Sequence, residues 1–156
     1  MPRLRCKTAL AVRRAIVTPN HHLLLVVLPT RLVAFAVEAN GSLKKCGTTR
    51  LDDSFGLSGN DHWEGITDNV GLAVSPNGRT LYMWHNTGFV DHHENSMVVY
   101  RLDKLGRVKP ISGPLVLVEY NIAGVRFIDR GRRMYVTNYD NGHRTYQIDR
   151  RGIPHP

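Results

Sequence analysis

The chain has 156 residues, of which 42% are hydrophobic, so it can bury the core of one ordinary domain. Lysine and arginine outnumber aspartate and glutamate by 21 to 13, and the formal net charge of +8 favours an anionic partner. The basic residues are spread along the chain without a recognised nucleic-acid motif or interleaved aromatic residues. We therefore expect a solvated basic surface and no nucleic-acid partner.

The cysteines bear on zinc sites and disulfides, and the apolar runs bear on secretory signals and membrane spans. Cys6 and Cys46 form no CxxC pattern, so neither a zinc site nor a disulfide framework is indicated, and their redox state stays open. The N-terminal "MPRLRCKTALAV" has too short an apolar run for a secretory signal, and "HHLLLVVLP" is too short to span a bilayer. We predict no membrane partner and favour a cytoplasmic location, with the compartment of any longer parent left open.

A repeat organises the chain in three copies. They read "AIVTPNHHLLLVVLPTRLVAFAVEANGSL", "LAVSPNGRTLYMWHNTG" continuing in "SMVVYRLDKLGRV", and "VRFIDRGRRMYVTNYDNGHRTYQIDRRGI". Each copy has a short apolar strand, a tight turn, a second apolar strand, an alternating strand, and a turn closed by Gly41, Gly106 or Gly152. The turn residues fit, because proline presets φ and glycine tolerates positive φ.

The spacing of the copies indicates β-propeller blades. The tight turns are 57 residues apart between Pro19 and Pro76, and 53 apart between Gly78 and Gly131. Blades have four strands and repeat about every 40 to 50 residues, and the excess here lies in two loops, 52–69 and 85–95. We predict an all-β chain, a single partial β-propeller segment over 1–156 with about three four-stranded antiparallel blades.

The expected strands follow in chain order. The first blade, 15–51, has strands at 15–18, 23–28, 31–37 and 42–50. The second, 70–118, has strands at 70–75, 80–84, 96–102 and 107–118. The third, 123–152, has strands at 123–128, 132–137 and 143–149, and we expect its fourth strand to be missing. "CKTALAV", before the first blade, is expected to supply the fourth strand of a preceding blade.

The repeats resemble a known family. "SPNGRTLYMWHNTG" with "SMVVYRLDKLGRV", and "RRMYVTN" with "RTYQIDRRG", resemble the lactonase-type β-propellers, which include 6-phosphogluconolactonase and carboxymuconate-cyclising enzymes, and more loosely the YVTN-repeat surface proteins. The resemblance covers roughly 15–152 and implies a closed ring of seven blades with a site at one mouth of the central channel. The motifs describe how a blade turns, so no catalytic residue is carried over from the family.

Three blades are too few to close a ring, because propellers use roughly 4 to 8. An open stack would leave apolar faces and strand edges exposed. We expect the chain to be a piece of a longer protein or, less favoured, to close a ring by self-association of several copies.

Chain topology places the candidate catalytic residues at one end of the blades, in the loops that enter each first strand and join each second strand to the third. Glu64 is a candidate general acid or base because the apolar Trp63 beside it would raise the pKa of its carboxyl group. His62 and His85 are the other candidates. Alternatively, Trp63 packs between blades and Glu64 has no catalytic role.

Three further residues are candidate substrate ligands. Arg126 could bind a carboxylate or phosphate with two hydrogen bonds, or could pair with an acid of a neighbouring blade. Asn121 and Asn138 lie near the same expected mouth.

The loop "WHNTGFVDHHENS" contains oxygen and nitrogen donors that are weak candidates for a divalent metal site: Asp91, His92, His93 and Glu94. Adjacent histidines on a loop lack the fixed spacing that a helix provides. A solvated polar loop is therefore expected there, and we predict no metal and no cofactor.

Two classes of function fit these features. The chain could be a lactonase-like protein or fragment that hydrolyses or cyclises a small anionic lactone or muconate-type substrate. Alternatively, it is a non-catalytic propeller scaffold that binds a protein partner, or a truncated inactive product.

Overall fold

The computed structural model describes residues 12–51, 70–85, 96–115, 117, 122–138 and 142–156. Blade one contains β1 (Arg14–Val17), β2 (Leu23–Leu28), β3 (Arg31–Val37) and β4 (Leu43–Arg50). Blade two contains β5 (Val70–Val74), β6 (Thr80–His85), β7 (Ser96–Leu102) and β8 (Val108–Pro110). Blade three contains β9 (Ile122–Ile128), the 3-10 helix η2 (Asp129–Gly131), β10 (Arg133–Asn138), β11 (His143–Ile148) and β12 (Pro154–His155).

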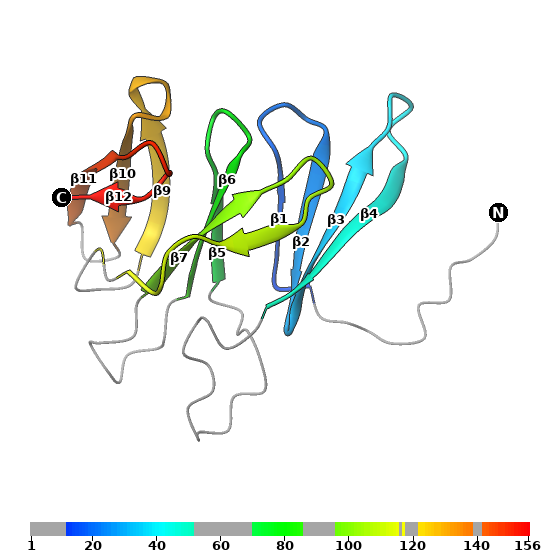
Figure 1. The fold of residues 1–156 in the computed structure, drawn as a ribbon, viewed down its shortest axis with the longest axis horizontal. Helices are drawn as coiled ribbons and strands as arrows, with labels where there is room; N and C mark the ends of the chain where they lie inside the picture. The colour runs from blue at the N-terminus through cyan, green and yellow to red at the C-terminus, as the bar shows by residue number, and fades with distance from the viewer. Residues whose placement is uncertain (1–11, 52–69, 86–95, 116, 118–121, 139–141) are drawn as a thin grey trace, which may run out of the picture.

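The three blades stand side by side in chain order (Figure 1). Each is a four-stranded antiparallel sheet in which strands that follow one another in the chain are also neighbours in space. This arrangement confirms the predicted all-β partial propeller. Among the described residues, no helix is long and apolar enough to cross a membrane.

The prediction that blade three lacks a fourth strand was wrong. Pro154 and His155 form β12, which pairs antiparallel with Ile148 and Gln147 of β11. The signal was missed because two residues cannot show the alternation by which a strand is recognised in a sequence.

The fourth strand of blade two is shorter than predicted. The expected span was 107–118, whereas β8 covers only Val108–Pro110, and a single bridge between Met97 and Leu115 follows it. Prolines lack the backbone N–H that a ladder requires, and Pro110 and Pro114 both fall in the expected strand. The expected strand before blade one lies outside the described residues, apart from Val12, which is exposed and not in a strand.

The tight turns of blades one and two share one hydrogen-bond pattern. The hydroxyl oxygens of Thr18 and Ser75 lie 2.6 Å and 2.7 Å from the side-chain oxygens of Asn20 and Asn77. The Thr18 and Ser75 hydroxyls also accept hydrogen bonds from the backbone N–H groups of Leu23 and Thr80, which follow the turns. The side-chain oxygens of Asn20 and Asn77 accept hydrogen bonds from the backbone N–H groups of His22 and Arg79. The motif [ST]-P-N in the sequence therefore encodes a side-chain-braced turn.

Two apolar cores lie between the blades rather than within them. Alternate residues of each strand face opposite sides of the sheet, so each blade can pack on both neighbours. The core between blades one and two includes Leu25, Leu32, Leu81, Met83 and Val98. The core between blades two and three includes Tyr82, Trp84, Met97, Met134 and Val136. Met134, Val136 and Tyr146 of blade three are buried in this second core.

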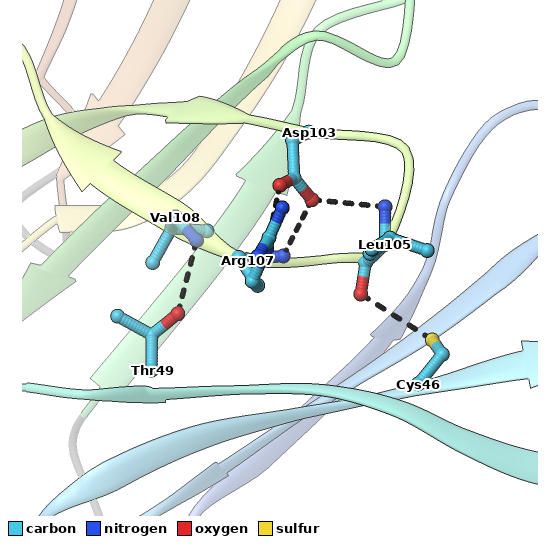
Figure 2. Close-up of polar contacts among 6 residues, drawn as sticks. All are labelled: Cys46, Thr49, Asp103, Leu105, Arg107 and Val108. Carbon is cyan, nitrogen blue, oxygen red and sulfur yellow. Dashed lines mark hydrogen bonds and ion pairs between the residues drawn. The ribbon is translucent and has the colours of Figure 1, made fainter.

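The turn between β7 and β8 connects blade two to blade one (Figure 2). Its Asp103 carboxylate accepts backbone hydrogen bonds from Leu105 and Arg107, each at 2.9 Å, and pairs with the Arg107 side chain at 2.8 Å. Across the junction, the Cys46 thiol donates to the Leu105 carbonyl at 3.3 Å, and the Val108 N–H donates to the Thr49 hydroxyl at 3.0 Å. The turn thus presents its backbone to β4.

The turn between β11 and β12 repeats this design in blade three. The Asp149 carboxylate accepts backbone hydrogen bonds from Arg151 at 2.9 Å and Ile153 at 2.8 Å, and contacts His155 at 3.1 Å. The Tyr82 hydroxyl of blade two donates to the Gly152 carbonyl at 2.7 Å. Burial opposes ionisation of Asp149, but the hydrogen bonds from Ile153, His155 and Arg151 outweigh it and lower the pKa of the carboxyl group.

Replacing Asp149 with alanine is expected to lower the melting temperature at pH 7 by about 2–4 °C, because two backbone N–H groups lose their acceptor. Since the folded carboxyl has a lowered pKa, its stabilising effect is present above the ordinary value of 3.8 and is lost as pH falls below it. The gap between the two melting temperatures should therefore narrow as the pH falls below 3.8. Asp149→Asn retains an acceptor oxygen and should lose less; equal losses for both variants would contradict this role.

Candidate functional site

His85 and Asn138 end equivalent strands in adjacent blades. Leu81 is the second residue of β6 and Met134 is the second residue of β10, and each pairs with the strands on both sides of it. His85 and Asn138 end these two strands, so they occupy matching positions in blades two and three. Both stand at the end of the blades opposite the tight turns. The structure therefore brings these two predicted site residues to one end of the row of blades.

Asn138 has a local structural role at this end. Its side-chain oxygen accepts a hydrogen bond from the Gly142 N–H at 2.6 Å, and its own backbone N–H donates to the Gly142 carbonyl at 3.0 Å. These bonds join the end of β10 to the residue before β11. The remaining hydrogen-bonding group of the side chain is the amide NH₂, which can donate to an acceptor such as a carboxylate or carbonyl oxygen.

Arg126 lies in the middle of β9, on the face of blade three that points away from blade two. Its neighbours Val125 and Phe127 pack against the core between blades two and three, so the alternation of the strand turns the exposed Arg126 side chain to the other face. Its register partner Tyr135 is three residues from Asn138, a separation of about 10 Å along the strand. Arg126 is therefore not grouped with His85 and Asn138, and its role as an anion ligand stays a prediction.

The other candidates fall outside the described residues. These are Glu64, His62, Asn121, Asp91, His92, His93 and Glu94. Within the part of the chain that the structure describes, no group of three or more histidine, cysteine, aspartate and glutamate residues could hold a metal ion.

Charge is strongly sorted along the chain. Only four of the thirteen acidic residues lie among the described residues: Glu38, Asp103, Asp129 and Asp149. The segments that hold the other nine are 52–69, 86–95, 118–121 and 139–141, and all of them adjoin strand ends at the same end of the blades as His85 and Asn138. Of the twenty-one basic residues, only Arg3, Arg5 and Lys7 lie outside the described part. Nine of the thirteen carboxylates therefore belong to segments outside the described residues that join strand ends on this side of the blades.

The described aspartates form ion pairs at turns, at the opposite end of the blades. Asp103 pairs with Arg107, Asp129 pairs with Arg133 at 2.5 Å, and Asp149 pairs with His155. Burial opposes ionisation of Asp103, but its bonds to Arg107 and Leu105 outweigh it and lower the pKa of its carboxyl group. An acid held ionised in this way is a poor proton donor, so Asp103 and Asp149 do not form a second candidate acid–base site.

Sequence reasoning missed this structural role, although a signal for it was present. "DKLGR" and "DRRGI" place an aspartate three residues before the glycine that closes the turn in blades two and three. The aspartate accepts N–H groups that a turn would otherwise leave without a partner, as such residues commonly do. The repeated pattern marks a turn, not a catalytic centre.

Comparisons with known proteins bear on the fold. No protein-family model matches the chain, and no curated protein matches it. A periplasmic gluconolactonase of Pseudomonas aeruginosa superposes with a TM-score of 0.65 and 19% identity, covering 92% of this chain and 37% of the other. A protein from Lactobacillus plantarum superposes with a TM-score of 0.63 and 11% identity, over 94% and 40% of the two chains.

The chain has a partial β-propeller fold. A third solved structure, Saccharomyces cerevisiae Sqt1, gives a TM-score of 0.52 at 11% identity, over 85% of this chain and 32% of the other. At these identities the likeness concerns the fold alone. The chain spans about two fifths or less of the length of the three structures.

Proposed function

We propose that this chain is part of a lactonase-like propeller that hydrolyses or cyclises a small anionic lactone or muconate-type compound at the mouth next to His85 and Asn138. The main support is the distribution of acidic residues: nine of the thirteen carboxylates belong to segments that adjoin this end of the blades. The likeness to a gluconolactonase over 92% of the chain supports the same reading. The proposed site would combine imidazole, amide and carboxylate groups, which are the groups that general acid–base chemistry uses.

In the proposed hydrolysis, a base removes a proton from water while the water oxygen attacks the lactone carbonyl. The ring C–O bond then breaks, and the released alkoxide takes up a proton, which gives the open hydroxy acid. His85, Glu64 and His62 are the proposed bases. Asn138 could donate its amide N–H to a substrate oxygen, and Arg126 stays a proposed ligand for the substrate's anionic group.

The purified chain should hydrolyse glucono-δ-lactone or 6-phosphogluconolactone above the spontaneous rate, with His85→Ala reducing kcat/KM by about 100-fold. The rate can be followed by proton release in weak buffer near pH 6.5. Lys104→Ala, which alters the opposite end, is the matched control and should keep full activity. No rate above background in a chain shown to be folded by circular dichroism would refute the proposal.

A second candidate, a non-catalytic scaffold, is favoured by one observation. The described aspartates all pair at turns, and Tyr82, Thr49 and Cys46 make contacts between blades. These groups brace turns and hold blades together, which is what a scaffold requires. A folded chain that shows neither hydrolysis nor cyclisation would favour this candidate.

A further inference from the structure

The turns at the end of the blades opposite His85 and Asn138 carry an excess of positive charge. Six turns form this end, and all of them lie within the described residues: 18–22, 38–42, 75–79, 103–107, 129–132 and 149–153. Together they hold seven arginine and lysine residues against four acidic residues. The acidic residues outside the described part belong to segments that join strand ends at the other end of the blades.

Local partners already occupy three of the four acids in these turns. The pairs are Asp103 with Arg107, Asp129 with Arg133, and Asp149 with His155. Among the described residues, Arg79, Arg130 and Arg132 form no ion pair, and all three are exposed. The excess charge at this end is therefore carried by side chains that are available to a partner.

One position of the repeat carries a basic side chain in every blade. It ends the turn between the first and second strands, where the backbone carbonyl accepts a hydrogen bond from the end of the third strand. The pairs of acceptor and donor are His22 and Val37, Arg79 and Leu102, and Arg132 and Ile148. The three basic residues are exposed, so the repeat presents one of them from each blade.

The three turns that carry this position stand in a row along one edge of the molecule (Figure 1). Neighbouring turns are in contact. A Cβ built at Gly78 of blade two would lie 3.7 Å from the Asn20 side chain of blade one, and one at Gly131 of blade three would lie 3.0 Å from Pro76 of blade two. The basic residues therefore form one continuous surface across the blades.

Blade three adds a second arginine to this row from a strained backbone. Asp129 and Arg130 have φ values of 51° and 57°, a left-handed conformation that disfavours residues with a Cβ atom. Asn20 and Asn77 hold the position of Arg130 in blades one and two, and neither has a positive φ. An exposed arginine kept in such a conformation favours a binding role for Arg130.

The spacing of the row favours an extended anion. Packed sheets lie about 10 Å apart, so His22, Arg79 and Arg132 are separated by steps of about 10 Å. Two guanidinium groups so far apart cannot bind the same carboxylate or phosphate. An extended peptide advances about 3.3 Å per residue, so carboxylates on every third residue would match the row.

The composition of the three turns disfavours other polyanions. They contain no phenylalanine, tyrosine or tryptophan on which the bases of a nucleic acid could stack. They also contain no large apolar side chain that could enter a membrane interface. A further blade of a longer propeller would pack on the face of a sheet, so it would flank this row without covering it.

We propose that the row formed by His22, Arg79, Arg130 and Arg132 binds an extended acidic segment of a partner protein, with carboxylates at about every third residue. Each carboxylate pairs with the basic group of one blade. The row lies at the opposite end of the blades from the proposed lactonase site, so this binding does not depend on that activity.

The probe is a fluorescein-labelled peptide of about twelve residues, with glutamate at every third position and serine and threonine between. Fluorescence anisotropy at about 50 mM salt should show saturable binding to the chain, and about 500 mM salt should weaken it strongly. Arg79→Gln/Arg132→Gln should weaken binding about fivefold, because two exposed ion pairs are lost. A peptide of the same composition with its glutamates in one block should bind less tightly.

The control is Lys44→Gln/Lys109→Gln, which makes the same change in net charge on the exposed outer strands β4 and β8 and should leave binding unchanged. Far-UV circular dichroism first establishes that each variant is folded, and Arg130→Gln tests the row independently of the double variant. No binding of the spaced peptide, equal affinity for both peptides, or an equal loss in the control would overturn the proposal. Tighter binding of a single-stranded oligonucleotide or of anionic lipid vesicles would also overturn it.

Discussion

Replacing Gly106 with alanine is expected to lower the free energy of unfolding by about 3 kcal/mol, measured by urea denaturation with far-UV circular dichroism. Gly106 has a φ of +74°, which disfavours any residue with a Cβ atom. A Cβ built at this position would lie 2.1 Å from the Cβ of Ala34 in blade one. The substitution therefore adds backbone strain and a steric overlap at the junction of blades one and two.

Gly41 provides a matched control for the backbone contribution. It holds the same turn position in blade one with a φ of +80°, but nothing lies within 4 Å of its added Cβ. Gly41→Ala should cost about 1 kcal/mol, which is the penalty of the left-handed backbone alone. Equal losses at Gly41 and Gly106 would show that the turn of blade two does not press against Ala34, and would contradict the packing of blades one and two.

Replacing Trp84 with alanine is expected to cost about 4 kcal/mol, measured in the same denaturation experiment. The side chain is 5% exposed, and a Cβ at Gly71 would fall 1.9 Å from its indole ring, so the ring lies flush against the β5 backbone. The indole N–H donates to the Ile122 carbonyl of blade three at 3.3 Å. Truncation would open a cavity between blades two and three and remove a hydrogen bond across them.

Trp84→Phe separates these two effects. It retains most of the buried ring and loses the hydrogen bond to Ile122, so about 1 kcal/mol should be lost. A cost below about 1 kcal/mol for Trp84→Ala would mean that blades two and three are not packed around this side chain.

Strand positions were predictable because the repeats carry strong local signals. The strands at 23–28, 31–37 and 96–102 were predicted to the residue. They are apolar or alternating runs between turns, and their packing agrees with that local preference. β12 was missed and β8 was overextended because both depend on pairing to an existing strand edge rather than on their own pattern.

The candidate site was less predictable because shared loop position does not establish side-chain proximity. Topology correctly placed His85 and Asn138 at one end of the blades, since strand direction determines that end. It placed Arg126 within the predicted strand 123–128 but did not reveal which face of blade three this side chain occupies, because that depends on which neighbouring residues fill the core. Nor did topology show that the Asn138 side-chain oxygen accepts a hydrogen bond from the Gly142 N–H, which is a structural role rather than substrate binding.

Contacts between the turns of one blade and the strands of the preceding blade are the central structural claim. A NOESY spectrum of the isotopically labelled chain tests them directly at Gly106 and Gly152. We expect cross-peaks between the Gly106 α protons and the Ala34 methyl group, and between the Gly152 α protons and the Thr80 side chain. A well-dispersed spectrum of the folded chain that lacks both sets of cross-peaks would contradict the packing of these blades.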